Sequence, residues 1–418
     1  MSTAYQDAVD AALCARYDDV WLVAGARTPF VDYNGVLREA SPTDLGICAA
    51  RALFERSRIP AAEVQAIVAG NVAQSSFDAY YLPRHVGLYA GVPLAVPALG
   101  VHRLCGTGFE TILAAADQIS LGRIQLALCV GAESMSRNPV AGYGHRSGFR
   151  MGQVDFRDFL WEATIDTASG TSMGETAENL ARRYGIGREE VDRFAAQSFA
   201  RAAAGWESGY FSDEVVTVEN AQWSLDGYAA RGLRLADRQS RVDRDSHVRP
   251  TDYATLAKLK PAFKGVQTGG NSSAIVDGAA AVLVASGDYV RANGLEPLAR
   301  IVAAATVGVP PEIMGIGPAP AMRAVLATAG LAVSEVGRIE INEAFGAQYL
   351  AVERELELDR ERVNRHGGAI AIGHPLAASG LRLSHTVARQ LVRDDQQFGI
   401  SSACAGGGQG VAILLERV

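Results

Sequence analysis

Apolar positions along the chain follow two different periods. Short runs in which nearly every residue is apolar predict strands whose two faces are both buried, as in a sheet with helices on either side. Longer stretches with an apolar residue every three or four positions predict helices. The predicted strands cover 20–24, 64–69, 125–130, 280–285, 300–304, 338–341, 399–403 and 410–415, and the predicted helices cover 41–56, 106–121, 319–329, 346–356 and 377–392. Strands that alternate with helices indicate an α/β architecture.

The same succession of elements occurs twice. In the first half a strand at 64–69 is followed by Cys105, a helix and another strand. In the second half a strand at 338–341 is followed by His374, a helix and another strand. Each half places one reactive side chain at the start of a helix, which suggests a duplicated α/β unit. Chance similarity between two generic βαβ units is the alternative.

The middle of the chain differs in composition from both ends. Residues 137–265 are richer in Arg, Asp, Trp and Gly, and they contain helical patterns at 174–184 and 189–209. We predict an inserted loop domain over 137–265. The first α/β half then spans 20–136 and is completed by 266–288, the second half spans 289–418, and residues 1–19 form an N-terminal extension. The chain length of 418 residues fits two or three domains.

Charge and cysteine content narrow the classes of function. The formal net charge of −7 argues against a nucleic-acid binder and against a protein of anionic membrane surfaces. No run approaches the roughly 20 apolar residues of a membrane span. Five scattered cysteines without a C-x-x-C pair argue against a disulfide framework or a zinc site, so we expect no bound metal. The acidic N-terminus lacks the apolar segment of a secretory signal, and we expect a cytoplasmic protein.

Cys105 stands in the segment Arg103-Leu-Cys-Gly-Thr-Gly, just ahead of a predicted helix. Because free N–H groups and the helix dipole stabilise a thiolate there, we expect a lowered pKa for the Cys105 thiol. Gly106 and Gly108 let a carbonyl group approach the backbone closely. A buried, inert cysteine is the alternative interpretation.

His374 precedes Pro375 in a glycine-rich segment. A proline at the first helical position would put His374 at or beside the N-cap, where an imidazole is biased toward its neutral form and can act as a base. A capping or packing histidine is the alternative. Asn342 follows the predicted strand 338–341, and its carboxamide could hold a water or a carbonyl oxygen. Its neighbour Glu343 could be a base, or the pair could be only a helix cap.

Cys404 ends a predicted buried strand and enters the glycine run 406–408. We expect its thiol to face open space at the edge of the sheet where α/β sites form. The glycine run offers backbone N–H donors for an oxyanion. A phosphate-binding glycine loop competes with this interpretation, but no Lys-Ser/Thr follows and no G-x-G-x-x-G is present.

These four segments, in this order, resemble the thiolase family over almost the whole chain, and in particular its 3-ketoacyl-CoA thiolase branch. Ile313-Met-Gly-Ile-Gly-Pro and Gln348-Tyr-Leu-Ala-Val-Glu-Arg are similar to that branch as well. The resemblance implies a duplicated, layered α-β-α core with an inserted loop domain. It also implies an acyltransferase that cleaves a 3-ketoacyl-CoA with CoA to acetyl-CoA (or another short acyl-CoA) and a shortened acyl-CoA, or that runs the reverse Claisen condensation. Coenzyme A is then a co-substrate, and no cofactor is permanently bound.

The resemblance implies a role for each reactive residue. Cys105 would be the nucleophile that carries the acyl group, and His374 would take its proton. Cys404 would exchange the proton at the acetyl α-carbon. Asn342, through a water and together with His374, would form one oxyanion hole, and the N–H groups of Cys105 and Gly406 would form the other.

The resemblance further implies coenzyme A contacts at Met173, Arg249, Phe263, Gly269, Ser273, Ala344 and Phe345. Arg249 and the three lysines at 258, 260 and 264 are candidates for the ADP phosphates. A solvated basic face is the alternative for these four residues.

Three positions depart from the family's pattern. His102 and His366 stand where the family usually has asparagine, and Ala377 stands where it usually has glycine. We hypothesise that His102 and His366 are partners near the site and reshape the acyl pocket.

Other functions stay open beside 3-ketoacyl-CoA thiolysis. One is an acetyl-CoA C-acetyltransferase that forms acetoacetyl-CoA. Another is the acyl-CoA-binding subunit of a fatty-acid oxidation complex with hydratase and dehydrogenase subunits. A ketosynthase would share the duplicated fold, but it uses two histidines where this chain has Cys404 and Asn342. The resemblance also implies a homodimer or homotetramer.

Overall fold

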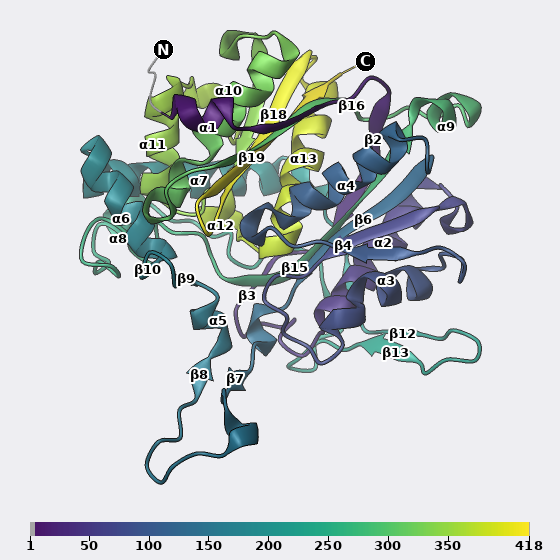
Figure 1. Ribbon diagram of the computed structural model, residues 1–418, viewed down its shortest axis with the longest axis horizontal. Helices are drawn as coiled ribbons and strands as arrows, with labels where there is room; N and C mark the ends of the chain where they lie inside the picture. Colours follow the sequence, from purple (N-terminus) through teal and green to yellow (C-terminus); the bar gives the residue numbers. More distant parts are fainter. Residues whose placement is uncertain (1–4, 418) are drawn as a thin grey trace.

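The computed structural model describes residues 5–417, and it is built around one large mixed sheet (Figure 1). Its strands are β1 (Leu13–Arg16), β2 (Val20–Arg27), β3 (Val31–Asp32), β4 (Ala66–Gly70), β5 (Ala98–Gly100), β6 (Leu126–Glu133), β15 (Val276–Ser286), β16 (Ala299–Gly308), β17 (Val336–Ile341), β18 (Phe398–Ala405) and β19 (Gln409–Glu416). Their order across the sheet is β17-β18-β19-β16-β2-β15-β6-β4-β5, with β1 paired to β16 and β3 paired to β15. Every strand expected from an apolar run is present, which confirms the α/β architecture.

Two sets of four strands share one topology. In the first set β4 runs parallel to β6, β6 antiparallel to β15, and β15 antiparallel to β2. In the second set β17 runs parallel to β18, β18 antiparallel to β19, and β19 antiparallel to β16. The sets join where β2 pairs with the start of β16. The fold is therefore the duplicated one that the repeat in the sequence predicts, while the exact domain boundaries stay a prediction.

Helices cover both faces of the first set. The longer helices outside residues 137–265 are α2 (Pro42–Ser57), α3 (Leu82–Ala90), α4 (Thr107–Ser120), α10 (Pro318–Ala329), α11 (Gly346–Leu356) and α13 (Leu376–Arg393). Along β6, Val130 and Ala132 point toward α2, whereas Cys129 and Gly131 point toward α4 and α13. Since successive strand residues face opposite sides, both faces of β6 are buried and its sequence is apolar up to its last residue, Glu133.

Residues 137–265 form helices and short strands beside the second half. Their elements are β7 (Val140–Ala141), β8 (Arg157–Asp158), α5 (Phe159–Glu162), β9 (Ile165–Asp166), β10 (Thr171–Ser172), α6 (Met173–Tyr184), α7 (Arg188–Glu207), β11 (Val218–Glu219), β12 (Ala221–Trp223), β13 (Arg231–Leu233), β14 (Arg241–Val242) and α8 (Tyr253–Leu256). Helices α6 and α7 pack against α11. The segment with β7, β8 and α5 is an arm that extends away from the body of the molecule (Figure 1).

The remaining helices are short: α1 (Gln6–Asp10), α9 (Gly287–Ala292) and α12 (Ala369–Ile372). Although residues 1–19 were expected to be an extension, β1 adds a strand to β16, so the described part of this segment belongs to the sheet. No helix within 5–417 is both long enough and apolar enough to cross a membrane.

Candidate active site

The first turns of α4 and α13 touch through their backbones. A Cβ atom on Gly108 would lie 2.7 Å from the carbonyl oxygen of Ala377, and one on Gly380 would lie 2.4 Å from the backbone nitrogen of Phe109. Neither position has room for a side chain, so glycine permits this contact. Because Cys105 precedes α4 and His374 precedes α13, the contact brings the two reactive residues of the two halves together.

Cys105 lies in a 3₁₀ turn, Leu104–Gly106, that leads into α4. Leu104 has a φ of 46°, a left-handed conformation that is strained for a leucine. Burial raises the pKa of the Cys105 thiol to about 11, although the N–H groups of Gly406 and of Cys105 itself act in the opposite direction. The expected lowering of this pKa is therefore wrong, because desolvation outweighs the helix terminus. The same two N–H groups are those that the resemblance assigns to an oxyanion hole.

His374 is buried and held at both ring nitrogens. Its Nδ1 lies 2.5 Å from the Ser379 hydroxyl, and its Nε2 lies 3.3 Å from the Asn342 side-chain nitrogen. Burial, and then the charge of Arg382, lower the pKa of His374 to about 3, so the imidazole is neutral as expected. Pro375 is the N-cap and not the first helical residue, so His374 lies one position before the cap.

Asn342 lies directly after β17, where its backbone N–H donates to Ser402 on β18. Its side-chain nitrogen donates toward His374, and its side-chain oxygen is buried and has no partner among residues 5–417. An acceptor without a donor in a buried site is costly unless a water or a ligand fills it. The predicted water-mediated role of Asn342 fits this geometry and stays a prediction.

Cys404 lies on β18 near the turn to β19. Its side chain is fully buried against Met314 and Ala344, so the expectation that it faces open space is wrong. The strand ends one residue later, at Ala405, and the chain turns back through residues 406–408 into β19. Burial, and then the nearby Cys105, raise the pKa of Cys404 far above its ordinary value.

Glu343 is neither an exposed base nor a helix cap. Its carboxylate accepts hydrogen bonds from the Ser198 hydroxyl, the Asn364 side chain and the N–H of Ile370. These partners connect the end of β17 to α7 and to the loop that leads to His374. We conclude that Glu343 holds this loop in place.

Most of the coenzyme A positions gather beside Cys404. Met173 and Phe345 pack on the cluster of Met314, Ala344 and Cys404. The Phe263 ring meets Phe345 edge to face, with 6.5 Å between ring centroids. Phe263 also lines a cavity of about 320 Å³, together with Trp161, Ile165, Gly170, Ser172, Glu175, Ala262 and Lys264.

Three further coenzyme A positions differ in their surroundings. The Ser273 N–H donates to the Ala344 carbonyl, so Ser273 lies beside the same cluster. Gly269 faces open space. Arg249 instead donates to His247 and lies over the ring of Phe199, while Lys264 lines the cavity. The roles of Arg249 and of the lysines at 258, 260 and 264 stay predictions.

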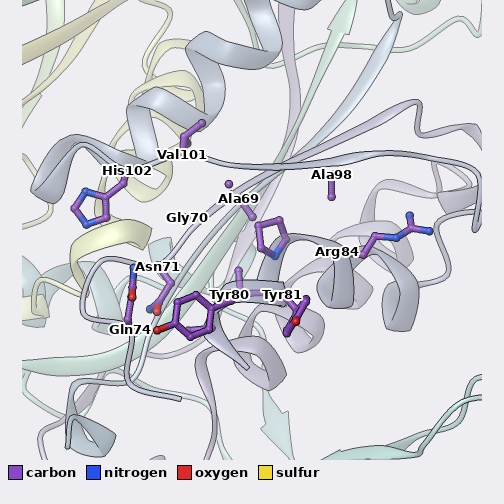
Figure 2. A pocket seen from close by; sticks show the side chains of 14 residues that line it. Ala69, Gly70, Asn71, Gln74, Tyr80, Tyr81, Arg84, Ala98, Val101 and His102 are labelled. Atoms are coloured by element: carbon purple, nitrogen blue, oxygen red, sulfur yellow. The ribbon is translucent and has the colours of Figure 1, made fainter. Parts of the chain in front are cut away.

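The structure places His102 and His366 in different surroundings. His366 stacks on Tyr210, with 3.5 Å between ring centroids, and burial lowers its pKa to about 4. His102 is exposed and lines a second cavity of about 320 Å³, at the opposite side from Arg84 (Figure 2). The two rings share no hydrogen bond or stacking contact in the described chain. The structure thus shows no direct contact between them, and their effect on the acyl pocket stays a prediction.

Ser379 and Glu133 are two residues of the site that sequence reasoning missed. Ser379 belongs to the same glycine-rich segment as His374, and its spacing of one helical turn from Pro375 is the signal that could have found it. Glu133 ends β6, and no local pattern distinguishes it from other strand-end carboxylates.

Comparisons with known proteins agree with this site. The Thiolase, N-terminal domain family matches residues 20–288, and the Thiolase, C-terminal domain family matches residues 295–417. A human protein named mitochondrial 3-ketoacyl-CoA thiolase is 42% identical over 401 residues, which cover 95% of this chain and 98% of that protein. An acetyl-CoA acetyltransferase of Pseudomonas aeruginosa is 40% identical over 403 residues, covering 96% of this chain and 99% of that protein.

Solved structures show the same relationship. The crystal structure of human mitochondrial 3-ketoacyl-CoA thiolase matches with a TM-score of 0.91 at 41% identity, covering 97% of this chain and all of that chain. A structure of that enzyme in complex with CoA matches with a TM-score of 0.90 at 41% identity, covering 96% and 98% of the two chains. With both family domains matched over most of the chain, and with the Cys105 and His374 loops joined at the crossing of α4 and α13, the chain belongs to the thiolase family of acyltransferases.

Proposed function

We propose that this protein cleaves a 3-ketoacyl-CoA with CoA, and catalyses the reverse Claisen condensation, through an acyl thioester on Cys105. The observation that carries the proposal is the crossing of α4 and α13, which joins the Cys105 loop to the His374 loop. The buried Cys404 lies nearby, on strand β18, which packs against the turn that holds Cys105. The names of the human and Pseudomonas relatives support both directions of the reaction.

The first half-reaction transfers the acyl group to the enzyme. His374 Nε2 takes the Cys105 proton while Sγ attacks the C3 carbonyl of the substrate. The C2–C3 bond then breaks, the acyl fragment stays on Sγ, and the electron pair of the bond forms the enolate of acetyl-CoA. Cys404 gives its proton to C2 of this enolate, and acetyl-CoA leaves.

The second half-reaction returns the enzyme to its starting state. The Cys404 thiolate takes the proton of the CoA thiol, whose sulfur attacks the thioester. Cys105 leaves with the proton held by His374, and the shortened acyl-CoA is released. Two thiols and one imidazole thus balance every proton of the cycle. Preorganised N–H donors at each oxyanion supply roughly 3–4 kcal/mol.

The resting site holds neutral groups. With a pKa of about 11 for Cys105 and about 3 for His374, a thiolate–imidazolium pair is disfavoured before substrate binds. The nucleophile therefore forms together with its attack on the carbonyl, when the developing charge reaches the substrate oxygen and its donors.

Thiolysis is tested with acetoacetyl-CoA and longer 3-ketoacyl-CoAs plus free CoA, following loss of the ketoacyl absorbance. We expect turnover by the wild type and none by Cys105→Ala. Cys48→Ala, on α2, is the matched control and should retain activity. No thiolysis of any substrate, or full activity in Cys105→Ala, would contradict the proposal.

We also propose that the protein is a homo-oligomer in a reducing compartment such as the cytoplasm. The outermost strand β5 carries the exposed Leu99. Exposed apolar residues also lie on the arm: Tyr143, Phe149, Met151, Val154 and Phe156. Exposed apolar patches and free strand edges favour association between copies.

The five cysteines are free, as a reducing compartment requires. Sedimentation equilibrium at micromolar concentration should give a dimer or tetramer, and a monomer would contradict the first proposal.

A further inference from the structure

Glu133 is a fully buried carboxylate that the reaction scheme does not use. It is the last residue of β6, and both of its oxygens are fully engaged. One oxygen accepts from the Asn71 side chain at 2.6 Å and from the N–H of Ala73 at 2.9 Å. The other accepts from the N–H of Val72 at 3.2 Å and from the N–H of Ala377 at 3.0 Å.

The bond to Ala377 crosses from the first half of the molecule to the second. Ala377 lies in the first turn of α13, whose N-cap residue Pro375 accepts no hydrogen bond with its side chain. A helix start leaves free N–H groups, and a negative charge stabilises it. Glu133 therefore supplies from β6 the cap that the α13 segment lacks.

The end of β6 also fixes the distance between the two reactive loops. A Cβ atom on Gly131 would lie 2.0 Å from the carbonyl oxygen of Ala377, so the strand and the helix are in backbone contact. Burial raises the pKa of Glu133 to about 7, although the N–H groups of Ala73, Ala377 and Val72 act in the opposite direction, so the carboxylate is ionised at alkaline pH. Its negative charge then disfavours the thiolate form of Cys105. One side chain thus touches the helix that starts beside His374, and its charge acts on the Cys105 thiol of the other loop.

We propose that Glu133 is a positioning residue for the acyl transfer, which caps α13 from the opposite half and so holds His374 in register with Cys105. This role rests on the proposed function, since it concerns the transfer of the Cys105 proton to His374. Asp277 offers a contrast within the same half. It is equally buried, but it accepts from the backbone and the hydroxyl of Ser136 and not from α13.

The test replaces Glu133 with Gln, which removes the charge and turns one acceptor into a donor that faces N–H groups. We expect kcat for thiolysis to fall about 10- to 100-fold, because a small displacement of reacting groups slows a reaction by this much. KM for CoA should change less than about twofold. The pH profile of Cys105 alkylation by iodoacetamide, followed by mass spectrometry of the Cys105 peptide, should shift to lower pH because the neighbouring negative charge is gone.

Asp277→Asn is the matched control, because it removes a buried carboxylate that does not touch α13. It should keep kcat within about threefold of the wild type and leave the alkylation profile unchanged. A Glu133→Gln enzyme with wild-type kcat, or with an unshifted alkylation profile, would overturn the proposal. So would equal effects of Glu133→Gln and Asp277→Asn.

Glu133→Asp covers the case in which Glu133→Gln does not fold. It keeps the charge, but its shorter side chain cannot reach both Ala377 and the loop at 71–73. A lowered kcat with a nearly wild-type alkylation profile supports the proposal, and a wild-type kcat overturns it. Alkylation of Cys105 does not require turnover. If the wild-type enzyme showed no thiolysis, the proposed function would be contradicted, and the alkylation profile would still decide the role of Glu133.

Discussion

For the single residue His374, the choice of tautomer decides whether the ring can act as a base at Nε2. The Ser379 hydroxyl lies 2.5 Å from Nδ1 and 3.2 Å from the carbonyl oxygen of Pro375. Since the hydroxyl has one proton and the carbonyl can only accept, Ser379 donates to Pro375 and accepts from Nδ1–H. Nε2 then carries the lone pair, which the Asn342 N–H approaches at 3.3 Å and must release when the ring takes a proton. Ser379 thus selects the tautomer that can take the Cys105 proton.

Ser379→Ala should lower kcat for thiolysis about tenfold, which corresponds to the loss of one hydrogen bond to the reacting imidazole. KM for CoA should stay unchanged, since Ser379 does not line the cavity that holds Phe263. Steady-state kinetics of purified enzyme measure both constants. The matched control is Ser384→Ala on the same helix, whose hydroxyl pairs with Ser401. Equal loss of activity in the two variants would show that Ser379 acts only through the stability of α13.

The reactive residues could be recognised from sequence, but their electrostatics could not. Glycines beside Cys105 and His374 mark positions where backbone and ligand come close, and that is a local signal. The pKa of Cys105 depends instead on desolvation by segments far away in the chain, including the Gly406 turn. A helix terminus contributes about 1 kcal/mol, which desolvation of a thiol can exceed. For the same reason the burial of Cys404 could not be read from its glycine neighbours.

At the scale of elements, the helices and strands lie where the periods of apolar residues predict them. The contacts between these elements could not be predicted in this way. The predicted helix 377–392 is α13, Leu376–Arg393, within one residue at each end. Its crossing with α4 depends on Gly108 and Gly380, which lie far apart in the chain and whose fit appears only in three dimensions. The separate surroundings of His102 and His366 could not be predicted either. A sequence pattern predicts the helices and strands, but it does not predict which of their faces pack against each other.

Gly380→Ala tests this crossing. The new Cβ would lie 2.4 Å from the Phe109 nitrogen, so α13 must move away from α4. We expect a loss of about 1–3 kcal/mol in the free energy of unfolding, as for other overpacked positions, and a fall in kcat of at least about tenfold. Urea unfolding and thiolysis kinetics measure the two effects. Gly308→Ala, where a Cβ meets nothing within 4 Å, should change neither. A Gly380→Ala enzyme with both wild-type stability and wild-type kcat would contradict close contact between the helices.

On the scale of the whole molecule, one buried charge network connects the inserted segment to both halves. Glu214 accepts from the Arg27 guanidinium of β2 at 2.6 Å and from the Thr386 hydroxyl of α13 at 2.9 Å. Arg27 also forms two hydrogen bonds with Asp245, at 2.7 and 2.9 Å. Both carboxylates come from residues 137–265, β2 belongs to the first half, and α13 to the second. The two halves of the core and the inserted segment are therefore joined by one network of buried charges. Because its residues come from distant parts of the chain, no single segment of the sequence reveals it.

The pH dependence of stability tests this network. Burial by itself would raise the pKa of Glu214, but the charges of Arg27 and Arg389 outweigh it and lower the pKa to about 2 from its ordinary value of 4.5. Because the folded state holds the carboxylate ionised, its stabilising effect is complete above about pH 4.5 and is lost as the pH falls toward 2. This shift corresponds to about 3 kcal/mol. Glu214→Gln should thus lower Tm strongly at pH 7, and its gap to the wild type should narrow steadily from pH 4.5 toward pH 3. Carboxylates whose raised pKa has other causes, such as Glu133, are common to the wild type and Glu214→Gln and cancel in the comparison. A gap in Tm that stays constant from pH 7 to pH 3 in differential scanning calorimetry would show that the ionised Glu214 does not hold the three parts together.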